Sequence, residues 1–414
     1  MMNSGVFAEF FENFRHNLFK PLLLFFYMGF LVPILGVEFE FPHVMYQALT
    51  IYLLVSIGWN GGEELAELNA GELTQALELM GVGFVTNFVI GIVAYILLRS
   101  LTGLRKVDAA TVAGYYGSDS AGTFATAKGV LNSLAATGAV GAAAYEFKAY
   151  MPVMLAVMEV PGCLVALFLV ARLRAEGMDA RGFLPNEDGY DPDALPPSAT
   201  DSGETIQHPP TSHGTQVGEL GHQPIGRRPT GSIINLKLLH EVFLNPGLYL
   251  LFGGIVIGFL SGLQNKSIRE KTITGDDDRL FLGLFQGVLC LFLLEMGMTA
   301  SRKLKDLRQA GLPFVALGLI MPPIFATFGI VVAHLFNLAT HADLTLGTYV
   351  MFSILCGAAS YIAVPAVQRL AIPEASPTLP LAASLGLTFS FNVTVGIPLY
   401  IQIAKAIQAA FPAG

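Results

Sequence analysis

The sequence predicts an all-α polytopic membrane protein, and three observations lead to this class. Its 414 residues are 53% hydrophobic and 13% charged, whereas soluble domains carry about 25% charged side chains. The mean hydropathy is +0.59. Apolar runs of the roughly 20 residues that a helix needs to cross the hydrocarbon core recur along the chain. We therefore expect most of the chain to lie in a membrane as helices.

Apolar runs bounded by charge, Pro and Gly predict ten transmembrane helices, five on each side of a polar segment. The expected spans of the first half are Phe19–Gly36, Met45–Gly61, Leu79–Leu98, Ala109–Leu134 and Tyr150–Ala171. Those of the second half are Gly247–Leu263, Leu280–Met298, Leu312–Phe336, Leu346–Leu370 and Leu379–Ile403.

The polar segment between the two sets is rich in Asp, Pro, Ser, Thr and Gly. Such a composition cannot bury enough apolar surface to order the chain. We expect three parts, which are a first five-helix membrane repeat at residues 1–174, a flexible linker at 175–235 and a second five-helix repeat at 236–414.

Two correspondences suggest that the halves are repeats. A Pro and a Gly of the first span recur 225 positions later, and Gly117 and Ser120 of the fourth span recur 240 positions later as Gly357 and Ser360. An odd number of spans makes the second repeat insert upside down relative to the first. Inverted repeats of this kind are common in secondary transporters.

The short basic loops predict the orientation. Lys and Arg cluster after the third, fifth and seventh spans, on the side that the positive-inside rule assigns to the cytoplasm. This places both termini outside and the linker in the cytoplasm. Basic residues between Lys266 and Arg279, and the acidic pair Glu38 and Glu40, oppose this bias.

Polar, glycine-rich runs interrupt the fourth and ninth spans. Ser118, Ser120, Thr123 and Ser360 are typical helix N-cap residues. Unpaired backbone persists at membrane depth only where protein, water or an ion satisfies it. We therefore expect two broken helices that face each other, whose N-termini favour an anion and whose carbonyl ends suit a monovalent cation. Alternatively, Gly117, Gly122 and Gly357 serve close helix packing, and the serines bond to the preceding turn.

Acidic residues within spans are costly and usually functional. Asp119, inside the first break, and Glu295, in the seventh span, are the better candidates for the polar site. For Glu159 the sequence leaves a functional role and pairing with a neighbouring helix open. Asn392 in the tenth span offers a further oxygen ligand. For Asn60, Glu63 and Glu64, at the end of the second span, a solvated helix end is favoured over an approach to the site.

Other classes of function find little support. Cys163, Cys290 and Cys356 lie in apolar segments without metal-ligand spacing. The linker histidines are scattered among Pro and Gly, which is typical of disorder. No phosphate-binding loop, nucleophile elbow or zinc pattern occurs, so an enzyme is not expected. The net charge of -8 gives no reason to expect nucleic acid as a partner.

Three motifs carry a resemblance to a known family. The runs GYYGSDSAGTFATA, CGAASYIAVPA and WNGGEELAE, which begin at Gly114, Cys356 and Trp59, resemble the sodium-dependent bicarbonate transporter family of cyanobacteria. The likeness covers both hydrophobic halves. It implies core and gate domains, a homotrimer in the lipid of the cell inner (plasma) membrane, and high-affinity import of bicarbonate with sodium (Na+) for carbon concentration. It also implies inhibition by a trimeric PII-like regulator from the cytoplasm.

The resemblance also implies where the ions bind. For bicarbonate it points to the matching positions in both breaks, which are Gly117, Ser118, Ser120, Ala121, Thr123, Gly357, Ala359 and Ser360. Sodium is expected close by, and Asp119, Glu295 and Asn392 are the candidate ligands. A sodium-coupled carrier of another small anion is the alternative, because helix N-termini recognise charge before shape.

Overall fold

Helices form all the regular structure in the computed structural model, which describes residues 21–136, 141–193, 246–268, 279–304, 307, 311–361 and 363–412. The predicted all-α class is confirmed. Within these ranges, five helices are long and apolar enough to cross a membrane, and two shorter ones are also apolar. The chain is a multi-pass membrane protein.

The first half contains seven described helical elements. They are α2 (Pro21–Leu35), α3 (His43–Glu67), α4 (Ala70–Leu101), α5 (Lys106–Tyr116), α6 (Ala121–Ala135), the short η1 (Ala142–Tyr145) and α7 (Met151–Ala175).

The second half contains ten, several of them segments of one longer helix. They are α9 (Pro246–Ile268), the π-helical η2 (Arg279–Gly283), α11 (Phe285–Lys303), α12 (Leu312–Thr340), α13 (Leu346–Gly357), α14 (Ala363–Ala371), α15 (Leu379–Leu381), the π-helical η4 (Ala382–Phe389) and η5 (Asn392–Gly396), and α16 (Ile397–Ala410).

The start of α4 differs from the expectation. Hydropathy predicts a span from Leu79, but the helix begins at Ala70. The Asn69 side chain accepts the Glu72 N–H, and the Glu72 carboxylate accepts the Asn69 N–H, both at 3.0 Å. This capping box satisfies two N–H groups and lets the helix begin in polar sequence.

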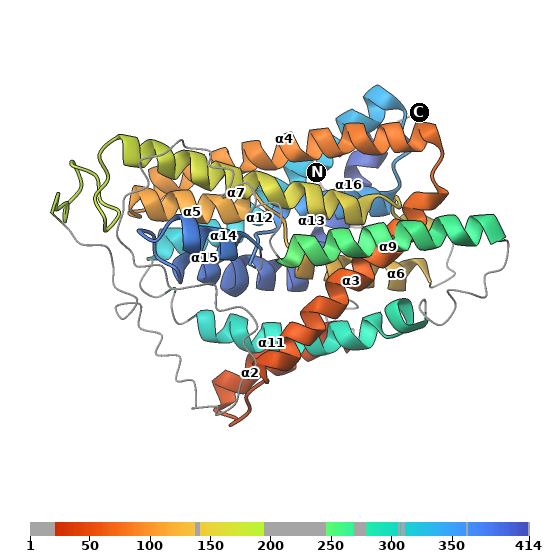
Figure 1. Ribbon diagram of the computed structural model, residues 1–414, viewed down its shortest axis with the longest axis horizontal. Coiled ribbons are helices and arrows are strands. Elements are labelled where there is room, and N and C mark those ends of the chain that lie inside the picture. The colour runs from red at the N-terminus through yellow and green to blue at the C-terminus, as the bar shows by residue number, and fades with distance from the viewer. Residues whose placement is uncertain are drawn as a thin grey trace.

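The helices pack as two assemblies that both draw on the two halves of the chain. In the flanking assembly, α3 packs on α9 and α2 packs on α11. Figure 1 shows α2 and α11 side by side at the lower edge of the molecule. The central assembly contains α4 to α7 and α12 to α16, where α4 and α5 pack on α7 and α12 packs on α13.

The α3/α9 contact depends on glycines. A Cβ on Gly58 would lie 2.4 Å from the Leu251 carbonyl oxygen, and one on Gly62 would lie 2.2 Å from that of Ile255. The two glycines are four residues apart, on one face of α3, so the backbones of the helices touch. This is the small-residue packing expected of helices in lipid.

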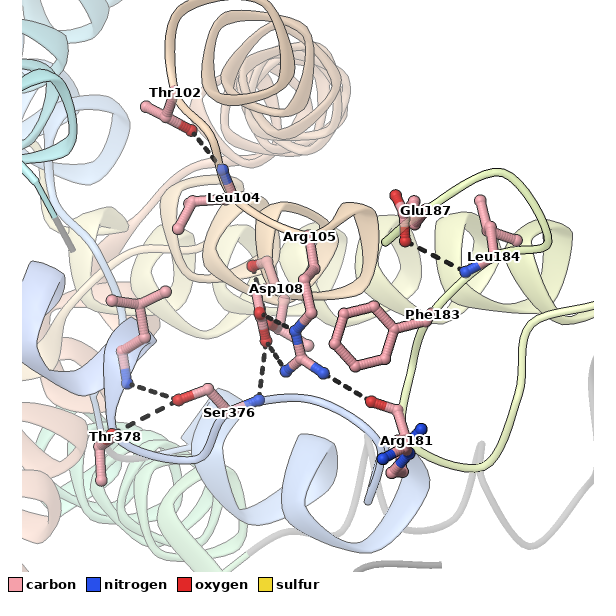
Figure 2. A network of polar contacts seen from close by, with 12 residues as sticks. Thr102, Leu104, Arg105, Asp108, Arg181, Phe183, Leu184, Glu187, Ser376 and Thr378 are labelled. Carbon is pink, nitrogen blue, oxygen red and sulfur yellow. Dashed lines mark hydrogen bonds and ion pairs between the residues drawn. The ribbon is translucent and has the colours of Figure 1, made fainter. Parts of the chain in front are cut away.

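The beginning of the linker is folded. Figure 2 shows Arg105, at the start of α5, donating to both carboxylate oxygens of Asp108 and to the Arg181 carbonyl, the last at 2.5 Å. Its guanidinium lies over the Phe183 ring. The N–H of Ser376 donates to the same Asp108 carboxylate. The network joins α5 and the loop before α15 to the chain that follows α7.

Asp179 organises this folded segment. Its carboxylate accepts the backbone N–H groups of Arg181, Phe183 and Asp191, at 2.9, 2.9 and 3.0 Å. Burial acts to raise the pKa of Asp179, but these hydrogen bonds outweigh it and hold the pKa below its usual value. Of the linker expected to be flexible at 175–235, residues 176–193 are thus a hydrogen-bonded turn, and 194–235 lie outside the described residues.

Candidate functional site

The two interrupted helices meet inside the central assembly. The first interruption separates α5 from α6, and the second separates α13 from α14. The Ser360 N–H in the second donates to the Tyr115 carbonyl beside the first, at 3.0 Å. The expected breaks therefore exist and face each other, joined by a backbone hydrogen bond between positions that are far apart in the sequence.

Two of the four expected cap residues, Ser120 and Ser360, act as caps. The other two do not, because the Ser118 hydroxyl donates to a carbonyl of α7 and the Thr123 hydroxyl donates to the Ser120 Oγ. Ser120 is the N-cap of α6, and its Oγ accepts the Thr123 N–H at 3.3 Å. The Ser360 Oγ accepts the Val364 N–H at 3.4 Å, near the start of α14. Both caps satisfy first-turn donors of helices that begin in the protein interior.

Glu159 of α7 contacts both breaks. Its backbone carbonyl accepts the Ser118 hydroxyl at 2.7 Å, and its carboxylate accepts the Ser360 hydroxyl at 3.3 Å. The residue is buried. The sequence left the role of Glu159 open. The structure places it where the two breaks meet, a place that we call the crossing. A Glu before Pro161 inside an apolar span is the signal that points to it.

Asp119 lies in the first break with no exposed surface. Both of its carboxylate oxygens are buried without a hydrogen-bond partner among the described residues. The carboxyl groups of Asp119 and Glu159 are close enough to interact electrostatically. A buried carboxylate without a partner is costly, so a cation or a proton is expected to neutralise it. Oxygen ligands of this kind fit a sodium ion.

Asn87 of α4 is a site residue that the sequence reading missed. Its Nδ2 donates to the Met158 carbonyl at 2.9 Å and to the Leu355 carbonyl at 3.2 Å. It thereby bridges α7 and α13 beside the crossing, and its Oδ1 is buried without a partner within the described ranges. A lone Asn inside an apolar span is the signal that marks such a residue.

Asn392 and Glu295 have different positions from Asp119. The Asn392 Nδ2 donates to the Gly357 carbonyl at 2.9 Å, so it caps the end of α13, and its Oδ1 accepts the Tyr400 hydroxyl at 2.6 Å. Glu295, on α11 of the flanking assembly, accepts the Thr299 hydroxyl at 2.9 Å. Asn392 therefore touches the second break, whereas the described hydrogen bonds do not join Glu295 to either break.

The glycines of the breaks also have a packing role. A Cβ on Gly117 would lie 2.9 Å from the Gly91 Cα, and one on Gly357 would lie 2.7 Å from the Ala326 Cβ. A Cβ on Gly122 would overlap the Tyr361 hydroxyl. The close-packing alternative thus holds for these glycines, and it holds together with the interruption of the helices.

A small cavity opens beside the first break. It has a volume of about 10 Å³, enough for about one water molecule. Ala121 and Gly122 of α6 line it on one side, and α3 and Phe292 of α11 line it on the other. The start of α6 therefore lies at the contact between the central and flanking assemblies.

A multi-pass helical protein whose interrupted helices cross at buried carboxyl groups has the architecture of an ion-coupled secondary transporter. The family model of the Na+-dependent bicarbonate transporter superfamily matches residues 21–405, and the chain belongs to that superfamily. The resemblance seen in three motifs is confirmed, and the family is one of transporters rather than enzymes. Comparison with curated proteins finds no match.

Proposed function

We propose that the protein is a sodium-coupled bicarbonate symporter that works by elevator-like alternating access. The observation that carries this proposal is the crossing of the two breaks, where Asp119 presents two buried oxygens without a hydrogen-bond partner among the described residues. Membership of the Na+-dependent bicarbonate transporter superfamily supports the choice of ions.

In this proposal the carboxyl groups bind the cation. Asp119, the Asn87 Oδ1 and the Glu159 carboxylate supply oxygens near the crossing. The capping of Gly357 by the Asn392 amide keeps the end of α13 in place. Glu295 lies in the flanking assembly, and its described hydrogen bond is to Thr299 and not to either break. We therefore rank it below Asp119 as a sodium ligand.

The anion binds at the start of α6 in this proposal. The positive end of the helix dipole and the first-turn N–H groups favour a small oxyanion there. The residues assigned to it are Gly117, Ser118, Ser120, Ala121, Thr123, Gly357, Ala359 and Ser360. Sodium at the neighbouring carboxyl groups offsets their negative charge, so each ion raises the affinity for the other by reciprocal linkage.

The movement follows from the two assemblies. The central assembly carries both breaks and corresponds to a core domain, and the flanking assembly corresponds to a gate domain. Ten spans in two inverted repeats account for the way in which both assemblies draw on both halves. The core moves against the gate and exposes the site to each side in turn.

The setting of the transporter is proposed from the same family relation. We place it in the inner (plasma) membrane as a homotrimer in lipid, with both termini outside and the linker in the cytoplasm, and we assign it high-affinity import for carbon concentration. A PII-like trimeric regulator inhibits it from the cytoplasm. The folded turn at residues 176–193 supports a regulatory surface there, because it ties the linker to α5 through Arg105.

Uptake of labelled bicarbonate into vesicles containing the purified protein tests the function. We expect uptake with an inward sodium gradient and none when choline replaces sodium. Uptake that is indifferent to this replacement would contradict symport. If bicarbonate is not taken up but another small anion is, in a sodium-dependent way, the alternative carrier is the correct assignment.

A further inference from the structure

A buried lysine on α6 takes part in a charged network that the proposed ion sites do not use. The Lys128 ammonium donates to the Asn60 Oδ1 of α3. The Asn60 Nδ2 donates to the Glu64 carboxylate at 2.7 Å, and the ammonium lies 5.5 Å from the centre of the Phe285 ring. The network therefore runs from a cation to an anion across the contact between α6 and α3.

This contact separates the two assemblies. Helix α3 packs chiefly on α9, whereas α6 packs on α13 and η1. We call the α3/α6 contact the seam. Asn60 and Glu64 were expected at a solvated helix end, but they lie in the seam and are largely covered. In the proposed movement of the central assembly against the flanking one, α6 shifts relative to α3 and the seam opens.

The seam leads from the first break to Lys128. Ala121 and Lys128 are seven residues apart, which on an α-helix places them on the same face about 10 Å apart. On α3, Ile57 lines the small cavity opposite Ala121, and Asn60 follows it one turn later. The Lys128 ammonium thus lies on the same helix faces as the cavity, two turns beyond the start of α6.

The ammonium keeps unused donors. Lys128 is buried, and its Nζ makes one hydrogen bond among the residues that the structure describes. An ammonium group has three donors, so two remain for another partner. A buried cation is costly unless it is paired. The negative charge of Glu64 is connected to the ammonium only through the amide of Asn60. The position in direct contact with the ammonium is therefore open to another group.

We propose that Lys128 is a second contact for the transported anion, on the route between the first break and the far end of α6. Its ligand class is a small oxyanion, and the inference rests on the proposed transport function. While the seam is closed, Asn60 holds the ammonium. When the seam opens, an oxyanion accepts hydrogen bonds from the two unused N–H donors of Lys128. It then moves along the same face of α6 to the break.

The test uses Lys128→Met in vesicles with labelled bicarbonate and sodium. We expect the KM for bicarbonate to rise by a factor of ten or more, with a smaller change in kcat and an unchanged sodium dependence. Lys128→Arg, which keeps the charge, should retain most of the affinity. Lys405→Met is the matched control, because Lys405 also lies near an aromatic ring, that of Tyr145, at 5.7 Å.

A double variant separates binding from charge balance. Lys128→Met with Glu64→Gln removes both charges, so neither is left buried and unpaired. We expect its KM to stay high. A return of the KM to the wild-type value would overturn the inference and leave Lys128 as a structural counterion of Glu64. A fall in kcat alone in Lys128→Met would equally overturn it.

A binding measurement distinguishes failure of the Lys128 inference from failure of the proposed transport function. Thermal unfolding of the wild-type and Lys128→Met proteins in detergent, titrated with bicarbonate, reports anion binding without transport. Wild-type vesicles without sodium-dependent uptake would refute the proposed function. The quantity compared is the bicarbonate concentration that gives half of the maximal stabilisation. A higher value in Lys128→Met would still support the anion contact, and equal values in the two proteins would refute it.

Discussion

Asp119 is the residue on which the proposed coupling depends most directly. Its two oxygens are buried without hydrogen-bond partners in the described part of the chain. Asp119→Asn keeps the shape and removes the charge. We expect sodium to lose most of its effect, with the sodium concentration for half-maximal bicarbonate uptake rising at least tenfold. Uptake measured over a range of sodium concentrations checks this.

The control for this variant is Asp343→Asn. Asp343 is exposed and has a positive φ of 47°, a conformation that Asn also tolerates. It should keep the wild-type sodium dependence. If Asp119→Asn shows the same dependence as this control, Asp119 is not a sodium ligand.

At this scale the sequence predicted the caps better than their partners. Ser120 and Ser360 are recognisable because capping depends on residues within one turn. Glu159 and Asn87 contact the breaks from other helices, so their roles depend on how α4 and α7 pack. A single polar residue in an apolar span marks a site but does not name its partner.

Helix contacts at glycines set the positions of the broken helices. A Cβ on Gly162 of α7 would lie 2.0 Å from the Gly114 carbonyl oxygen of α5. Gly162→Ala must therefore push α5 away from α7, and overpacking of this kind costs about 1–3 kcal/mol. We expect a lower unfolding temperature in detergent and reduced uptake.

Gly81→Ala on α4 is the matched substitution. No described atom outside its own helix lies within 4 Å of the added Cβ. Ala favours a helix over Gly by about 1 kcal/mol, so this variant should be as stable as the wild type or more so. Equal losses of stability in both alanine variants would show that the α5/α7 contact is not the cause.

The turn at the start of the linker has a predictable pH dependence. The pKa of Asp179 is held below its usual value. The stability that its carboxylate gives to the turn is therefore fully present above about pH 4 and is lost as the pH falls through the lowered pKa. Between pH 7 and pH 5 we expect the exchange protection of the amides of Arg181 and Phe183 to stay constant after correction for intrinsic rates. Asp179→Asn should reduce this protection.

Asp188→Asn serves as the comparison, since Asp188 is exposed in the same turn. It should leave the protection unchanged. Protection in the wild type that falls already between pH 7 and pH 5 would show that Asp179 does not hold the turn. Composition predicted disorder here because it does not register a single carboxylate that accepts three backbone N–H groups.

Hydropathy predicted the elements well where a helix is apolar throughout. It missed the polar first turns of α4, which depend on the capping box of Asn69 and Glu72. It also treated the last span as one regular helix, whereas η4 and η5 are π-helical. Such changes of helical type depend on packing with neighbouring helices, to which a hydropathy profile is blind.

Over the whole molecule, the two halves of the chain are interlocked. Helices α2 and α3 of the first half pack on α11 and α9 of the second. We expect two fragments, 1–200 and 201–414, to co-purify and restore sodium-dependent uptake when they are produced together. Each fragment alone should not yield a stable protein. An active or stable single fragment would contradict the interlocked packing.

The family and the all-helical class could be recognised from the sequence because they follow from composition and short motifs. The partner of each helix could not, since α3 and α9 are joined by Gly58 and Gly62 through contacts across about 200 residues of sequence. Glycines spaced by four are common in membrane helices, and the sequence does not say which helix they meet.

The α3/α9 contact also has a consequence for biosynthesis. When Glu67 leaves the ribosome, the helix that will cover the glycine face of α3 has not been made, and Ile268 at its end follows about 200 residues later. At about 5–20 residues per second, this is a wait of roughly 10–40 s. During that interval the glycine face of α3 is not covered by α9, so lipid or another protein has to cover it until the second half arrives.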